Sequence, residues 1–145
     1  MATLHAAPVG ELDPLVLYAI LRLRTDVFVV EQECAYPELD GRDVEPGALL
    51  LWGEDGARRI LGTLRLLIDS PDVRRIGRVA TAAHARGSGV AAELVGYAIE
   101  LAGGAEVVLD AQAHLRGWYQ KLGFLVDGPE FVEDDIPHVP MRLNR

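Results

Sequence analysis

The sequence predicts one α/β domain over residues 1–145, with a mixed, mainly antiparallel sheet flanked by helices. Its length is that of a single domain and is enough to bury a substantial core. Two apolar, strand-like runs separated by an Asp-Gly turn signal predict an antiparallel hairpin. Further along, a strand, a glycine loop, a helix and a second strand follow one another, which predicts a right-handed βαβ crossover.

The first helix is expected to begin after Asp13, a residue type that caps helices, with Pro14 at the first helical position. Residues 34–47 are rich in Pro, Gly and acidic residues without periodicity, which predicts a loop longer than a connection requires. Loops of this kind often form a substrate wall. In the first helix, the apolar residues that recur at helical spacing are Val16, Ile20, Leu23, Val27 and Val30.

An antiparallel meander is expected next, from strands at 49–53, 60–68 and 73–81. Asp55-Gly56 turns the chain between the first two strands, and residues 69–72 turn it between the second and the third. The third strand leads directly into the glycine loop.

A helix from Val90 to Leu101 follows the glycine loop, and Gly103-Gly104 ends it. The apolar run 106–110 is then a buried strand, and the crossover makes it a parallel neighbour, or nearly so, of the strand at 73–81. The remaining elements are a short helix at 114–122, ended by Gly123, and closing strands at 124–126 and 139–143.

The formal charge is -8, and acidic residues gather at 31–45 and 130–135. Without a basic stripe or an aromatic platform, nucleic acid is excluded as a partner. An acidic rim favours a cationic or amine substrate, although acidic surface residues most often only solubilise a protein.

No apolar run is long enough to cross a bilayer, and the N-terminus lacks the order of a secretion signal, so a cytoplasmic protein without membrane contact is expected. The single cysteine, Cys34, cannot form an internal disulfide and lacks a basic neighbourhood that would make it a nucleophile. His5, His84 and His114 show no ligand spacing, so no metal is expected.

Arg86-Gly87-Ser88-Gly89-Val90-Ala91 is the most informative stretch. Glycines let the backbone approach a ligand, and free N–H groups opening a helix supply donors to an anion, which indicates a pyrophosphate cradle. Two alternatives stay open here: a tight connection without a ligand, and a dinucleotide fingerprint with Asp110 as the ribose-binding carboxylate. A Walker pattern is excluded, because no Gly-Lys-Ser/Thr follows the glycines.

The meander, this loop and Trp118-Tyr119-Gln120-Lys121-Leu122-Gly123-Phe124 together resemble the GNAT superfamily of N-acetyltransferases. The chain departs from the superfamily at Ala83, where many members carry proline between strand and loop. Four further segments are similar to the ElaA-like branch: Arg24-Thr25-Asp26-Val27-Phe28-Val29-Val30-Glu31-Gln32, Asp40-Gly41, Ala111-Gln112-Ala113-His114 and Ile136-Pro137-His138.

The resemblance implies that main-chain amides of Arg86, Gly87, Ser88, Gly89, Val90 and Ala91 hold the pyrophosphate of acetyl-CoA. It also implies that the main chain at Val79, Ala80 and Thr81 pairs with the pantetheine arm and polarises the acetyl carbonyl. Because a hairpin meander precedes the glycine loop, the order of elements argues against the dinucleotide interpretation, and Asp110 is then structural.

Tyr119 is the expected general acid, since a phenol of ordinary pKa about 10 stays protonated at neutral pH and can protonate a leaving thiolate. The base that takes the amine proton is less well indicated: Glu31, Glu33 and His138 are candidates, and Glu31 is preferred. Trp118 is interpreted as packing, and Arg22 and Arg24 as partners of nearby carboxylates.

The sequence therefore predicts direct transfer of an acetyl group from acetyl-CoA to a primary amine, on a small molecule or a peptide. Three alternatives remain: an NAD(P)-binding Rossmann-like oxidoreductase domain, a CoA-binding regulatory module without catalysis, and the same chemistry with another acyl donor. A homodimer is expected only because dimers are common among soluble enzymes.

Overall fold

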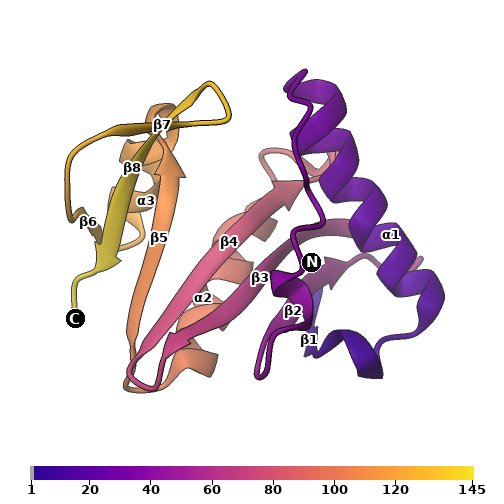
Figure 1. Ribbon diagram of the computed structural model, residues 1–145. Helices are drawn as coiled ribbons and strands as arrows, with labels where there is room; N and C mark the ends of the chain where they lie inside the picture. The colour runs from indigo at the N-terminus through magenta and orange to yellow at the C-terminus, as the bar shows by residue number, and fades with distance from the viewer. Residues whose placement is uncertain (1) are drawn as a thin grey trace.

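The computed structural model describes residues 2–145 and contains one sheet of eight strands, drawn in Figure 1. The strand order is β1-β2-β3-β4-β5-β8-β6, with β7 also paired to β8. Only β4 and β5 are parallel, so the expected mixed, mainly antiparallel sheet is confirmed. The strands are β1 (Thr3–Ala7), β2 (Leu49–Glu54), β3 (Ile60–Ser70), β4 (Val73–Thr81), β5 (Glu106–Gln112), β6 (Phe124–Val126), β7 (Phe131–Glu133) and β8 (Ile136–Leu143).

Helices cover both faces of the sheet: α1 (Pro14–Thr25) lies on one face, and α2 (Val90–Ala102) and α3 (Arg116–Lys121) on the other (Figure 1). The alternation of side chains in a strand explains how β2 serves both layers. Its Leu51 packs into the large core beneath α2, whereas Leu50 and Trp52 pack against Ile20 of α1. We call the face that carries α1 the front face.

The first helix begins as predicted, with the Asp13 carboxylate accepting a hydrogen bond from the Leu15 N–H at 2.8 Å. It differs from the expected regular helix after Thr25, where the chain widens into the π-helical segment η2 (Asp26–Glu31). The N–H of Gln32 donates to the Val27 oxygen at 3.3 Å, five residues back. After this wider turn, Glu31 contacts Arg86 and Gln32 contacts Gln112.

Two strands were not expected from the sequence. β1 is a five-residue run without a strand pattern of its own, and it pairs along the edge of β2, from Thr3 opposite Glu54 to Ala7 opposite Leu50. β7 is three residues long and pairs with β8 across a turn in which Asp134 and Asp135 both have positive φ. The predicted helix at 114–122 divides into a 3-10 turn, η5 (Ala113–Leu115), followed by α3.

Candidate active site

The strands β4 and β5 separate part of the way along β4. Their parallel pairing runs only from Val73 opposite Glu106 to Ile76 opposite Leu109, and Figure 1 shows the two strands running apart beyond that point. Arg78 causes a bulge, because Thr63 pairs with Ala80 and Arg65 with Gly77, which leaves two β4 residues opposite Leu64. The φ of Arg78 is +52°, a left-handed conformation typical of such bulges. The C-terminal half of β4 therefore has an open edge on the β5 side.

Main-chain groups of β4 point alternately toward β3 and toward this open edge. The Ala82 N–H donates to the Leu61 oxygen of β3 at 2.8 Å. By alternation, Ala80 also faces β3, whereas the main-chain groups of Val79 and Thr81 face the opening. Of the three main-chain positions expected to meet a pantetheine arm, two point into the opening and Ala80 points away from it.

The glycine loop joins the end of β4 to the N-terminus of α2 through a 3-10 turn, η4 (Ala83–Ala85). Gly87 and Gly89 have φ of +83° and +87°, a backbone conformation that favours glycine, and a Cβ built on either would meet nothing within 4 Å. The Ser88 N–H donates to the Ala85 oxygen at 3.1 Å. The Val90 N–H reaches the Ser88 Oγ at 3.4 Å.

Three main-chain donors of the glycine loop remain available. Across residues 2–145, the N–H groups of Gly87, Gly89 and Ala91 have no hydrogen-bond acceptor. They lie at the positive end of α2, where an anion is favoured by the helix dipole as well as by the donors. The loop is thus suited to a diphosphate.

Arg86 and Glu31 form an ion pair at the rim of this loop. The Arg86 guanidinium donates to both carboxylate oxygens of Glu31, one at 2.6 Å, and each side chain is about half exposed. The hydrogen bonds from Arg86 hold the pKa of Glu31 below its ordinary value. The sequence assigned these two residues to different tasks, and the structure brings them together.

Tyr119 lies on α3, with its ring 5% exposed. Its ring packs edge-on against Trp118 and Phe124, with centroids 4.8 and 6.0 Å apart, and Trp118 serves as packing as expected. Burial raises the pKa of Tyr119 to about 12. No group among residues 2–145 hydrogen-bonds its hydroxyl, yet the oxygen is not fully buried, so it keeps contact with solvent. The phenol is therefore a neutral donor without a hydrogen-bond partner among residues 2–145.

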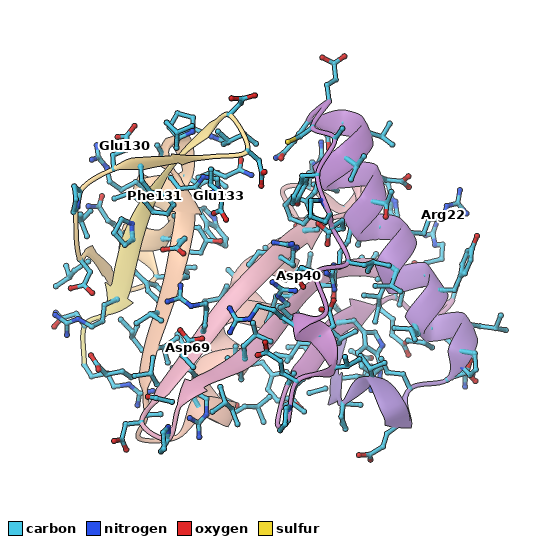
Figure 2. The ribbon with its side chains drawn as sticks, viewed as in Figure 1. Arg22, Asp40, Asp69, Glu130, Phe131 and Glu133 are labelled. Carbon is cyan, nitrogen blue, oxygen red and sulfur yellow. The ribbon has the colours of Figure 1, made fainter. Side chains whose placement is uncertain are left out.

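Arginines from three elements anchor the loop at 34–47 on the front face. The sequence predicted only the part played by Arg24, which was expected to pair with nearby carboxylates. Arg24 is 1% exposed and donates to Glu38 at 2.5 Å and to Asp43 at 2.7 Å, so that expectation is confirmed. Arg65 of β3 binds both oxygens of Asp40 at 2.8 Å. Figure 2 shows Asp40 over the sheet.

Arg78, the bulged residue of β4, completes this anchor. Its guanidinium lies 3.0 Å from a Glu38 oxygen and over the ring of Tyr36, at 5.4 Å from the centroid. The Tyr36 hydroxyl donates to Glu38 at 2.7 Å. The loop at 34–47 is therefore fixed to the part of β4 whose edge toward β5 is open. It forms a wall of the front face.

A second contact ties this loop to β5 and the β7–β8 hairpin. The carboxamides of Gln32 and Gln112 donate to each other, both at 3.3 Å. The Cys34 thiol donates to the Asp134 oxygen at 3.4 Å. Burial, and then the charges of Asp134 and Asp135, raise the pKa of Cys34, so it stays a thiol.

His138 lies in the same hairpin, at the register position opposite Gln112. Its Nδ1 is 2.7 Å from the Ile136 oxygen, and its ring stacks on Phe131 with centroids 5.7 Å apart and planes at 21°. Figure 2 shows Phe131 and Glu133 on this hairpin. Glu33 is exposed on the loop that faces it.

Among residues 2–145, no three His, Cys, Asp or Glu side chains gather as ligands of a metal ion. In the same part of the chain, no helix is both long and apolar enough to cross a membrane. Asp110 pairs with Arg75 at 3.1 Å on the sheet, the structural role expected once the dinucleotide interpretation is set aside.

Comparison with known proteins shows which sequences and structures this chain is similar to. Residues 26–145 match the model of the acetyltransferase (GNAT) domain. A UPF0039 protein of Mycobacterium tuberculosis is 45% identical over 134 residues, which cover 90% of this chain and 86% of that protein. Protein ElaA of Escherichia coli is 37% identical over 140 residues, 91% of this chain and 90% of that protein. The crystal structure of an acyl-CoA N-acyltransferase from Pseudomonas aeruginosa has a TM-score of 0.90 at 36% identity, covering 99% of this chain and 100% of that one.

Proposed function

Because this chain belongs to the GNAT acetyltransferase family and is an acyl-CoA-dependent N-acyltransferase, we propose that it moves an acetyl group from acetyl-CoA to a primary amine by direct attack. One observation carries the proposal. The open edge of β4 leads directly into a loop with three free N–H donors at the start of α2. The acceptor is a small-molecule or peptide amine.

Binding of the co-substrate follows the main chain. Val79 and Thr81 present N–H and C=O groups that an extended pantetheine arm pairs with, as a strand would. Gly87, Gly89 and Ala91 donate to the diphosphate. Side-chain identity matters little at these positions, except that the glycines must keep positive φ.

Arg86 and Glu31 change partners in this proposal. A diphosphate on the loop attracts the Arg86 guanidinium, because charge-assisted hydrogen bonds to phosphate are strong. Removing Arg86 from Glu31 then relieves the interaction that lowers the Glu31 pKa. Glu31 stays our sequence-derived candidate for the base, and it can take a proton only in this released state.

Tyr119 is the proposed general acid for the leaving sulfur. Its pKa of about 12 keeps it protonated, but complete transfer to a thiolate of pKa about 8.5 is uphill by about 4 to 5 kcal/mol. We therefore expect the hydroxyl to donate a hydrogen bond as charge develops on sulfur. The transfer is completed as the proton lost by the new amide nitrogen restores the phenol.

Two rival functions predict other results. An NAD(P)-binding domain is disfavoured by the meander that precedes the loop and by the pairing of Asp110 with Arg75. A CoA-binding module without catalysis has no use for a phenol that stays protonated and has no hydrogen-bond partner among residues 2–145. The homodimer and the lack of a nucleic-acid partner remain predictions.

The test measures the melting temperature with acetyl-CoA, CoA and NAD(P), and then thiol release over a panel of amines. A ligand at a hundred times its Kd stabilises by about 2.7 kcal/mol, so CoA and acetyl-CoA should each raise the melting temperature by roughly 9 °C. The Tyr119→Phe variant should release thiol about 10- to 1000-fold more slowly, and Tyr18→Phe, on the exposed side of α1, at the wild-type rate. A response to NAD(P) alone, or an unchanged rate in Tyr119→Phe, overturns the proposal.

A further inference from the structure

Three of the segments by which the sequence resembles its family meet at one corner of the molecule, through residues that have no part in the scheme above. Gln32 follows η2, Gln112 ends β5, and His138 lies on β8. The two glutamines pair with each other, and His138 is the register partner of Gln112. Residues separated by 80 or more positions in the sequence are thus neighbours.

This corner lies on the front face. In β5 and β8, Ala111 and Val139 are buried in the core beneath α2, so their strand neighbours Gln112 and His138 point to the opposite face. The loop that supplies Gln32 lies on that face as well. An acceptor approaching an acyl group held at the open edge of β4 from the front meets these side chains.

The corner also borders the opening between β4 and β5. Glu31 contacts Arg86 of the glycine loop, which continues β4, while the next residue, Gln32, contacts the last residue of β5. Of these two consecutive residues, Glu31 therefore contacts the β4 side of the opening and Gln32 the β5 side. His138 stands beside the second of these contacts.

The surroundings of His138 fix which of its nitrogens can act as a base. The Ile136 carbonyl is an acceptor only, so at 2.7 Å it requires a proton on Nδ1 of the imidazole. The lone pair of the neutral ring is then on Nε2, which no group among residues 2–145 hydrogen-bonds. The Phe131 ring, stacked on the imidazole, fixes its plane. This is a basic nitrogen with a set orientation and no partner.

We propose that Nε2 of His138 takes the proton from the ammonium form of the acceptor, and that the paired Gln32 and Gln112 carboxamides form the polar wall beside it. The proposal rests on the acyl transfer proposed above and gives His138 the step for which Glu31 was the candidate. The nitrogen, freed of one proton, forms its bond to the acetyl carbon as the carbon–sulfur bond breaks. The sulfur is protonated from Tyr119, the second nitrogen proton restores the phenol, and the imidazolium returns its proton to solvent.

The geometry favours His138 over Glu31 in this step for a physical reason. Without CoA, Glu31 has a cationic partner that stabilises its charged form and makes it a weaker base. Even after Arg86 turns to the diphosphate, a carboxylate is by its ordinary pKa a weaker base than an imidazole. His138 has a hydrogen bond that leaves its Nε2 free and has no ion-pair partner among residues 2–145. The titratable groups on the elements packed around it include Glu33, Cys34, Asp110, His114, Glu133, Asp134 and Asp135.

The experiment compares the pH dependence of kcat/KM for the wild type, His138→Gln, Glu31→Gln and His5→Gln. His5 is a matched control, because it also stacks on an aromatic ring, Trp52, at 5.2 Å, but on β1 at the far edge of the sheet. His138→Gln should lower kcat/KM about 100- to 10,000-fold and abolish the acidic limb, with CoA affinity unchanged. The ionisation of the free amine appears in every variant and serves as an internal reference.

Phe131→Leu keeps the imidazole and removes only its stacking partner. It should lower kcat/KM less than His138→Gln does and displace the acidic limb without abolishing it. This variant tests the role of His138 even if His138→Gln folds poorly. A wild-type rate in His138→Gln, an unmoved limb in Phe131→Leu, or loss of the limb in Glu31→Gln instead, overturns the assignment. A wild-type protein that transfers no acetyl group to any amine defeats the proposed function itself, which the variants do not affect.

Discussion

Replacing Gly89 by alanine tests the glycine loop most directly. The residue has φ +87° and ψ 2°, and a Cβ there meets nothing within 4 Å, so the cost comes from the backbone conformation and not from a clash. A left-handed conformation costs an L-residue about 1–2 kcal/mol. With an unfolding entropy of about 2.1 cal/mol/K per residue, a chain of 145 residues should lose roughly 3–7 °C of melting temperature.

The same substitution should weaken CoA binding. A loop that leaves the left-handed conformation moves the free N–H groups of Gly87 and Ala91 away from a common anion. Losing one hydrogen bond to a charged group costs about 1.5–3 kcal/mol, so the Kd should rise about 10- to 150-fold. Titration calorimetry with CoA measures this directly.

Gly96→Ala is the matched control. Gly96 lies inside α2, its added Cβ also meets open space, and its φ is not positive. Alanine should raise the melting temperature by about 2–3 °C through helix propensity and leave the Kd unchanged. If Gly89→Ala binds CoA as tightly as the wild type does, or is stabilised as much as Gly96→Ala, then neither the left-handed turn nor its donors hold the diphosphate.

Three further results are expected. Arg24→Met removes a buried arginine that bridges two carboxylates, Glu38 and Asp43, and should cost about 3–5 kcal/mol, or roughly 10–16 °C of melting temperature. Arg22→Met on the exposed side of α1 should change the melting temperature by less than about 3 °C. Burial alone would raise the pKa of Asp40, but its hydrogen bonds from arginine and from a backbone N–H hold it well below the ordinary value. Its contribution to stability is thus present above about pH 4 and is lost as pH falls toward the folded pKa, so Asp40→Asn should flatten the acid side of the stability curve measured by urea unfolding. Glu31→Gln frees the guanidinium of Arg86 before the diphosphate arrives, so the Kd for CoA should fall by about two- to fivefold, and a rise in Kd would contradict the exchange of partners.

Local signals in the sequence were sufficient for most elements. The Asp13-Pro14 cap, the Asp55-Gly56 turn and the glycines after α2 act through residues a few positions away, so their structures were predictable. β1 was not, because its five residues have no strand pattern of their own and pair only once β2 is in place. The π-helical widening at η2 likewise has no local signal.

The residues of the candidate site also divide into those with a local signal in the sequence and those placed by contacts between distant segments. Arg86, the glycines of the loop and Tyr119 were recognisable as candidates, because a main-chain anion site and a phenol acid each need particular residue types in a particular order. The pairing of Arg86 with Glu31 depends on contacts across 55 positions, and the sequence could only name each partner separately. The open edge of β4 depends on a bulge at Arg78, a residue type that does not itself favour positive φ.

The sequence by itself determined the order of the elements other than β1 and β7, the glycine loop at 86–91 and the family, because these depend on residue type and short spacing. Only the tertiary structure decided that β4 and β5 separate after Ile76 and which amides face the gap. It also decided that Gln32, Gln112 and His138 share one corner. The physical reason is that strand pairing and side-chain contacts between distant segments form only when the whole core packs, and no single segment encodes them.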